Sequence, residues 1–206
     1  MNSVEKLTEL FGKFPGIGPR QAKRFVYFLL TRQNGFVKEF TELTLRLKDE
    51  ISMCSSCFRY YPKEKGVSKL CTICRDSHRN VEVLMIVPRD IDLENIERSG
   101  SFTGTYFILG GTVPILEKEP AKRIRQKELL VIVSDKIKSG RLKEIILAMN
   151  LNPEGENTVD YIKKLLSPII SKSEVKISTL GKGLSTGTEL EYSDPDTLKN
   201  ALKNRG

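Results

Sequence analysis

Four cysteines constrain this chain more than any other feature of its sequence. They form two Cys-x2-Cys pairs, Cys54 with Cys57 and Cys71 with Cys74, separated by thirteen residues. Each pair places two thiolates on one side of a tight turn, and together they supply a tetrahedral sulfur set suited to Zn²⁺. Because four thiolates leave no open position for a catalytic water, we expect a structural zinc site. Buried free thiols and Cys-x-x-Cys redox chemistry are alternatives that the paired motif disfavours.

The segment between the two cysteine pairs mixes aromatic and basic residues. It reads Phe58-Arg59-Tyr60-Tyr61-Pro62-Lys63. One interpretation is that these side chains pack around the metal, which is the more frequent arrangement. The other is that Tyr60 or Tyr61 stacks on a nucleic-acid base. The sequence leaves both interpretations open.

A glycine-rich turn interrupts the N-terminal part of the chain. Apolar residues recur at helical spacing from Val4 to about Glu50, with one sharp break at Phe14-Pro15-Gly16-Ile17-Gly18-Pro19. Proline and glycine force a tight turn there, and Pro19 suits the first turn of the following helix. The pattern predicts two helices joined by a short hairpin.

Basic residues follow this turn directly. Gly16 and Gly18 allow backbone amides to approach another surface closely, and amides at a helix N-terminus bind phosphate. Arg20, Lys23 and Arg24 lie on the first turns of the second helix, within reach of flanking phosphates. The helix-hairpin-helix arrangement therefore predicts binding to the DNA backbone without base reading. The alternative is a simple turn followed by a solvated basic face.

The C-terminal part alternates between strand-like and helix-like segments. Val81–Val87 is a nearly continuous apolar run, which is typical of a strand buried on both faces. The other expected elements are helices at 90–98, 126–138, 156–166 and 195–203, and strands at 106–109, 143–149 and 175–180. Strands that alternate with helices at this spacing predict an α/β fold with a parallel sheet covered by helices.

Charge and composition restrict the kinds of partner and site that this chain can have. The chain carries 34 Lys and Arg against 26 Asp and Glu, a net charge of +8, which favours polyanionic partners. Its lone histidine excludes a His-rich metal centre. No apolar run approaches the roughly 20 residues of a membrane span, and Met1–Lys6 does not resemble a secretory signal. We expect a cytoplasmic, nucleoid-associated protein without membrane contact.

Taken together, these motifs resemble the RecR family of bacterial recombination mediators. The resemblance covers nearly the whole chain. Besides the hairpin and the cysteines, it includes these segments: Pro88-Arg89-Asp90, Leu109-Gly110-Gly111, Glu154-Gly155-Glu156, the stretch from Gly183 to Tyr192, and the Thr197-Leu198 helix. The order and spacing of all these motifs are more specific than any one of them.

This resemblance implies a domain organisation and a set of partners. The regions would be a helix-hairpin-helix at 1–50, a four-cysteine zinc finger at 51–79, a Toprim-like α/β domain at 80–180 and a C-terminal oligomerisation segment at 181–206. The chain would form a dimer or a ring-like tetramer. It would bind DNA independently of sequence and act with RecO and RecF to help load RecA at gapped DNA. Arg20, Lys23 and Arg24 match the family's basic DNA contacts.

The chain also departs from the family pattern where Toprim enzymes carry an acidic site. Ile86 stands where an acidic residue is expected at the end of the first strand, and the segment 113–120 lacks the family's usual sequence. Glu154 and Glu156 remain, as a docking surface or a weak Mg²⁺ site. We therefore expect no catalysis. The alternatives are a Toprim-type DNA-processing enzyme, such as a nuclease or a primase-related factor, and a scaffold that binds only protein.

Overall fold

The structure, a computed structural model, describes residues 1–63, 69–181, 183–184, 187 and 189–203. Three residues of the C-terminal motif, Ser185, Thr186 and Thr188, therefore lie outside the described residues. The chain divides into two compact units, Met1–Ser52 and Met53–Gly206. None of the described helices is long and apolar enough to cross a membrane.

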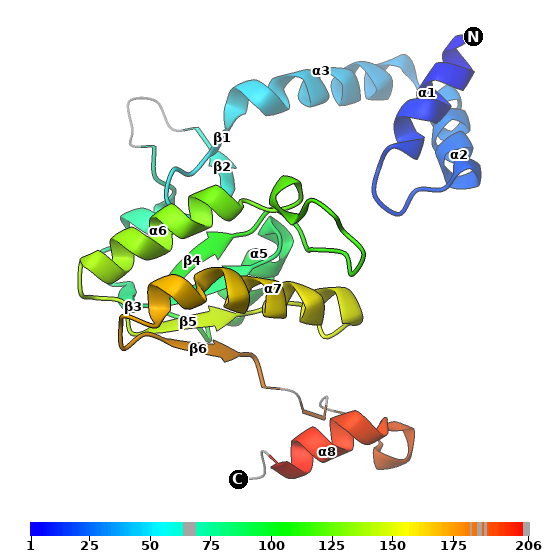
Figure 1. Ribbon diagram of the computed structural model, residues 1–206. Helices are drawn as coiled ribbons and strands as arrows, with labels where there is room; N and C mark the ends of the chain where they lie inside the picture. The colour runs from blue at the N-terminus through cyan, green and yellow to red at the C-terminus, as the bar shows by residue number, and fades with distance from the viewer. Residues whose placement is uncertain (64–68, 182, 185–186, 188, 204–206) are drawn as a thin grey trace. The chain divides into compact units, whose positions relative to one another are not determined.

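The N-terminal unit consists of three helices, α1 (Ser3–Gly12), α2 (Pro19–Leu30) and α3 (Asn34–Glu50) (Figure 1). Asn2 caps α1 in a capping box with Glu5. The two helices of the predicted hairpin pack together through α2, where Ala22 and Val26 are buried. The expectation of a single break was wrong, because α2 ends at Leu30 and a new helix begins at Asn34.

The cysteine segment forms short elements of its own. Strands β1 (Ile51–Met53) and β2 (Tyr60–Pro62) make a two-stranded sheet, and α4 (Thr72–Arg75) follows as a single helical turn. The sequence predicted no helix or strand in this region. Its elements are too short to show periodicity, so only the cysteine spacing marked them in the sequence.

A four-stranded parallel sheet forms the centre of the second unit, as predicted. Its strands run in the order β4 (Gly104–Ile108), β3 (Asn80–Val87), β5 (Glu144–Leu147) and β6 (Lys176–Thr179), and every neighbouring pair is parallel. The connecting helices are α5 (Asp90–Ser99), α6 (Gln126–Lys138) and α7 (Pro153–Ile170). Single 3-10 turns lie at Pro120–Lys122 and Leu190–Tyr192, and α8 (Pro195–Lys203) is the last helix.

Helices α6 and α7 lie on one face of the sheet and α5 lies on the other (Figure 1). An apolar core fills the space on each side. On one face, Leu129 of α6 and Ile162 of α7 pack against a cluster that includes Leu84 and Ile86 of β3. On the other face, Leu93 of α5 packs with the alternate residues of the same strands. Alternation of the β3 side chains between two covered faces explains why the sequence there is an unbroken apolar run.

The strand order places a topological switch beside β3. The chain passes from β3 to β4 on one side and then crosses to β5 on the other. In open parallel sheets the crevice at such a point, outside the carboxyl ends of the strands, is the usual ligand site. In this chain it lies between the end of β3 at Val87 and the end of β5 at Leu147.

Candidate metal centre and nucleic-acid interface

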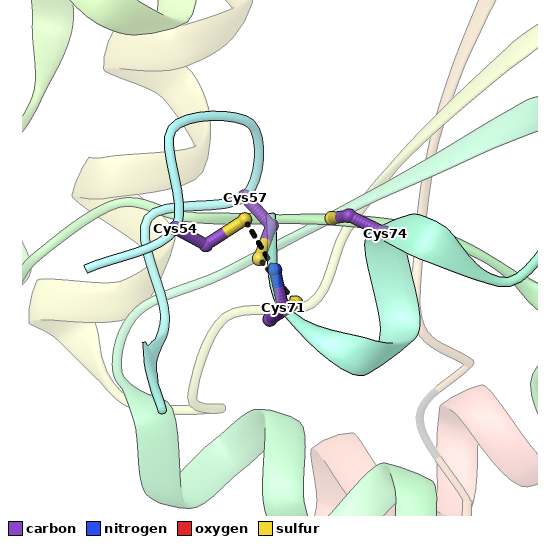
Figure 2. Close-up of side chains that lie close together, drawn as sticks. All are labelled: Cys54, Cys57, Cys71 and Cys74. Carbon is purple, nitrogen blue, oxygen red and sulfur yellow. Dashed lines mark hydrogen bonds between the residues drawn. The ribbon is translucent and has the colours of Figure 1, made fainter. Parts of the chain in front are cut away.

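The four cysteine thiols converge on one point (Figure 2). Cys54 and Cys57 come from the turn between β1 and β2, whereas Cys71 is the N-cap of α4 and Cys74 lies within that helix. All four sulfur atoms lie within 4.8 Å of one another, and Cys57 Sγ is 3.6 Å from Cys71 Sγ. Zn–S bonds of about 2.3 Å in a tetrahedron put the sulfurs about 3.8 Å apart. The arrangement fits one Zn²⁺ ion.

The electrostatics of this cluster also favour a bound cation. Cys54, Cys57 and Cys71 are buried. The neighbouring thiols of Cys57, Cys71 and Cys74 lower the pKa of Cys54. The neighbouring thiols of Cys54, Cys71 and Cys74 raise the pKa of Cys57, and burial raises it further. Because the four groups cannot all ionise alone, a divalent ion is needed to hold them as thiolates.

The cysteine cluster is attached to the parallel sheet. The amide of Ile108 donates to the carbonyl of Cys57 at 2.8 Å, at the end of β4. Phe58, the next residue, has a positive φ of 64° and its ring meets Phe107 edge to face at 5.3 Å. Three of the ligands also belong to the core beneath α5. The cysteine cluster is therefore part of the packing of the second unit.

A partly buried ion pair holds the far end of the cysteine segment. The guanidinium of Arg79 donates two hydrogen bonds to the carboxylate of Glu97 on α5, and the hydroxyl of Tyr106 donates to the same carboxylate at 2.6 Å. Burial, followed by the hydrogen bond to Glu97, raises the pKa of Tyr106 well above its ordinary value. The tyrosine stays neutral and remains a donor, so the segment is fixed at both ends.

The two tyrosines of the segment between the cysteine pairs have different surroundings. Tyr61 is half-buried and packs against the core beneath α5. Tyr60, its neighbour on β2, keeps 55% of its surface exposed. Because alternate residues of a strand face opposite sides, adjacent tyrosines cannot both pack around the metal.

The hairpin in the first unit presents unsatisfied amides to solvent. Gly18 is the N-cap of α2 in an extended conformation, and no side chain caps the helix. Pro19 occupies the first turn, where its missing amide costs nothing. Gly16 has a φ of 75°, a conformation that favours glycine. A Cβ atom added at Gly18 would meet nothing within 4 Å. The fold itself therefore does not require glycine at position 18.

The three cations predicted to contact DNA are all exposed on α2. Arg20, Lys23 and Arg24 are spaced by three and four residues, so they share one side of the helix, while Ala22 and Val26 are buried. Lys23 lies 5.9 Å from the ring centre of Tyr27, and Arg24 donates to Gln21 at 3.3 Å. Within the described residues none of the three forms an ion pair. Their charge is available to an external anion.

The two candidate carboxylates of the acidic site, Glu154 and Glu156, face different neighbours. Both lie in the first turn of α7. Thr112, in the loop after β4, donates a hydrogen bond to Glu154. Glu156 is exposed and lines a different region, a cavity of about 320 Å³ with Leu147 and Thr179. Positions i and i+2 of a helix do not face each other, so the geometry gives no shared chelate.

Gly155, which lies between these two carboxylates, packs closely against the backbone of Asn150. A Cβ atom at this position would lie 2.0 Å from the carbonyl oxygen of Asn150. The side chain of Asn152 caps α7 by accepting from the amide of Gly155 at 2.8 Å. The motif Glu154-Gly155-Glu156 thus contains a glycine for steric reasons. This close approach holds the start of α7 against the end of β5.

The remaining Toprim position carries no acidic group. Ile86 is fully buried and pairs in register with Phe107 on β4 and Leu147 on β5. Asp90 and Asp92 lie in the first turn of α5, as expected from the sequence. Among the described residues, the four cysteines are the only group of three or more potential ligands that converges. The sequence analysis missed Thr112, because nothing local marks a residue that orients a carboxylate 42 positions away.

Comparisons with known proteins agree with this architecture. Residues 82–180 match the model of the Toprim domain, and residues 183–205 match the model described as the C-terminal part of RecR. The chain is 35% identical to the recombination protein RecR of Bdellovibrio bacteriovorus over 100% of its own length and 97% of that protein. It is 34% identical to the RecR proteins of a Nocardioides species, over 98% and 95% of the two chains, and of Dehalococcoides mccartyi, over 98% and 93%. The chain therefore belongs to the RecR family.

Proposed function

We propose that this protein is a non-catalytic, DNA-binding recombination mediator that acts in recombinational DNA repair. Its relatives are named recombination proteins, which supports the general role. The observation that carries DNA binding is the uncapped N-terminus of α2, flanked by the exposed Arg20, Lys23 and Arg24. By family membership, we extend the proposal to action with RecO and RecF in loading RecA at gapped DNA. Association with the nucleoid would follow from DNA binding.

The chemistry at the hairpin supports contact with the sugar-phosphate backbone. Amides at a helix N-terminus and mobile cationic side chains both recognise phosphate oxygens and carry no sequence information. Affinity should therefore be similar for unrelated sequences and should fall steeply with salt, because bound cations release counterions. Fluorescence anisotropy with labelled oligonucleotides at several salt concentrations measures both properties. Binding that is insensitive to salt would contradict the proposal.

Substitution of Gly18 is expected to change DNA affinity without lowering stability. Gly18→Ser adds a hydroxyl at an N-cap position, where serine is favourable, so thermal stability should stay equal or rise slightly. The serine hydroxyl would accept hydrogen bonds from the amides that would otherwise bind a phosphate. DNA affinity should therefore fall by about tenfold. Gly35→Ser, at an equally open glycine in α3, is the matched control and should leave affinity unchanged. Unchanged affinity in Gly18→Ser would argue against phosphate at this helix end.

We also propose that the first unit pairs with a second copy of the chain. None of the residues of α3 is buried, yet it carries a stripe of exposed apolar side chains at helical spacing. The stripe consists of Phe36, Phe40, Leu43 and Leu47. A self-complementary apolar face is typical of a two-fold interface. The segment 181–206 would provide the second contact needed for a ring-like tetramer.

Light scattering tests this assembly. Phe40→Asp combined with Leu47→Asp should reduce the mass in solution, because both carboxylates would be buried at the interface. Thr41→Asp, on another side of the same helix, should leave the mass unchanged. A double variant that keeps the wild-type mass would show that α3 is not the contact.

The absence of turnover is part of the proposal. Ile86 can neither ligate a metal nor transfer a proton, and Glu154 and Glu156 face different neighbours. Two separate carboxylates bind Mg²⁺ weakly through water at most. The zinc ion that fits the four cysteines has a complete shell and would act structurally. The acidic residues at the start of α7 are therefore better suited to docking a partner.

A further inference from the structure

The outer face of the small β1–β2 sheet carries an unusual pair of exposed side chains. The amide of Cys54 donates to the carbonyl of Arg59 at 2.9 Å, which sets the register of the hairpin and places Met53 opposite Tyr60. The exposed fractions of these two side chains are 45% and 55%. Tyr61, on the opposite face, packs into the core. The face with Met53 and Tyr60 is therefore the solvent-facing one.

This face is rigid, which suits it to stacking. The amide of Tyr60 donates to the carboxylate of Asp90 on α5 at 2.8 Å. The turn just before β2 contains two of the four cysteines, and its Cys57 carbonyl accepts from Ile108 at the end of β4. A ring held in place loses little entropy on binding a flat ligand. Tyr60 is thus a fixed aromatic platform.

One cation, Arg125, reaches Met53, the neighbour of Tyr60 on this face. The guanidinium of Arg125 lies 3.7 Å from the sulfur of Met53 and 5.8 Å from the ring centre of Phe58. Arg125 also lines a surface cavity of about 380 Å³ together with Gly110, Lys122, Arg123 and Lys127. An exposed ion pair links Lys122 to Glu119 and is weak enough to open for a phosphate, whereas Arg123 pairs with the partly buried Glu117. The surface combines one aromatic face with nearby positive charge.

Single-stranded nucleic acid matches this combination. Its bases expose their flat faces, and its backbone supplies the negative charge that a cationic cavity attracts. In a duplex the same faces are covered by neighbouring base pairs. We propose that Tyr60 stacks on an unpaired base of single-stranded DNA, with the adjoining phosphate directed to the cavity beside Arg125. This inference rests on the proposed DNA binding and adds a second contact in the unit Met53–Gly206.

Substitutions at Tyr60 test stacking directly. The full-length protein is titrated against a single-stranded oligonucleotide, a duplex of the same length and a single strand with abasic positions. Tyr60→Leu should lower affinity for the ordinary single strand by about 5-fold or more, whereas Tyr60→Phe should keep it, because only the latter retains an aromatic face. For the abasic strand, wild type and Tyr60→Leu should bind equally. The salt dependence should not change, since Tyr60 neutralises no phosphate.

The outcomes distinguish this contact from the proposed function itself. If wild type shows no salt-dependent DNA binding, both proposals fall. If wild type binds but Tyr60→Leu binds the ordinary single strand equally well, only the stacking contact is overturned. An equal loss for Tyr60→Leu on ordinary and abasic strands would also overturn it, because no base would be involved. A melting temperature matching wild type confirms that each variant is folded.

Discussion

Reversing the charge of Arg20, Lys23 and Arg24 together, each to Glu, should lower DNA affinity by about 100-fold or more at low salt. Each cation that contacts a phosphate contributes about 0.9 to the slope of affinity against salt on a logarithmic scale, so the slope should also fall by about 3. All three side chains are exposed, so the fold should not change. Anisotropy titrations at several salt concentrations, with circular dichroism as a check of folding, provide the measurement.

A second charge reversal in the same unit is the control. Lys38, Arg46 and Lys48 are exposed cations of α3, and the first two form only surface ion pairs with Glu42. Their triple substitution by Glu changes net charge by the same amount at another place. It should reduce affinity far less, through the general field alone. Equal losses in the two triple variants would mean that net charge, and not the hairpin, determines binding.

Removing the metal should have the largest effect on stability. Structural zinc contributes on the order of 10 kcal/mol to folding, so a strong chelator or Cys57→Ser should unfold the cysteine segment. Because Cys54, Cys57 and Cys71 belong to the core beneath α5, the loss should extend to the sheet and lower its melting temperature sharply. Metal analysis should find one zinc per chain in wild type, and calorimetry should follow the transition.

The matched control for zinc removal is Ser55→Ala. Ser55 lies in the same turn as Cys54 and Cys57, and its hydroxyl makes a long hydrogen bond to the carbonyl of Lys69, at 3.4 Å. This variant should retain zinc and most of its stability. Wild-type protein that contains no zinc, or that melts at the same temperature after chelation, would refute a structural role for the metal.

Local patterns in the sequence predicted most of the fold. The cysteine spacing predicted that the four thiols would converge, because the geometry of a Cys-x2-Cys turn depends only on adjacent residues. Alternating apolar segments identified the sheet, since buried parallel strands and amphipathic helices differ in period. The hairpin was recognisable from Pro15, Gly16 and Gly18, which have strong backbone preferences of their own.

Features that depend on tertiary contacts were not predictable. The break between α2 and α3 at Thr31–Gln33 is an exception, because Asn34-Gly35, a dipeptide typical of turns, follows it directly and could have marked it. Glu154 accepts a hydrogen bond from Thr112, whereas Glu156 lines a cavity with Thr179 of β6, and both Thr112 and β6 are distant in sequence. Likewise, only the register of the β1–β2 hairpin distinguishes the exposed Tyr60 from the packed Tyr61.

The hydrogen bond between Ile108 and Cys57 has a consequence for solubility. Strand β4 is an outermost strand of the sheet, and an unprotected outer strand can recruit strands of other molecules. The cysteine turn protects part of that edge, because the carbonyl of Cys57 accepts a hydrogen bond from the Ile108 amide. Loss of zinc would thus do more than loosen one loop: it would uncover a template for intermolecular β-pairing, and the demetallated protein would be prone to self-association.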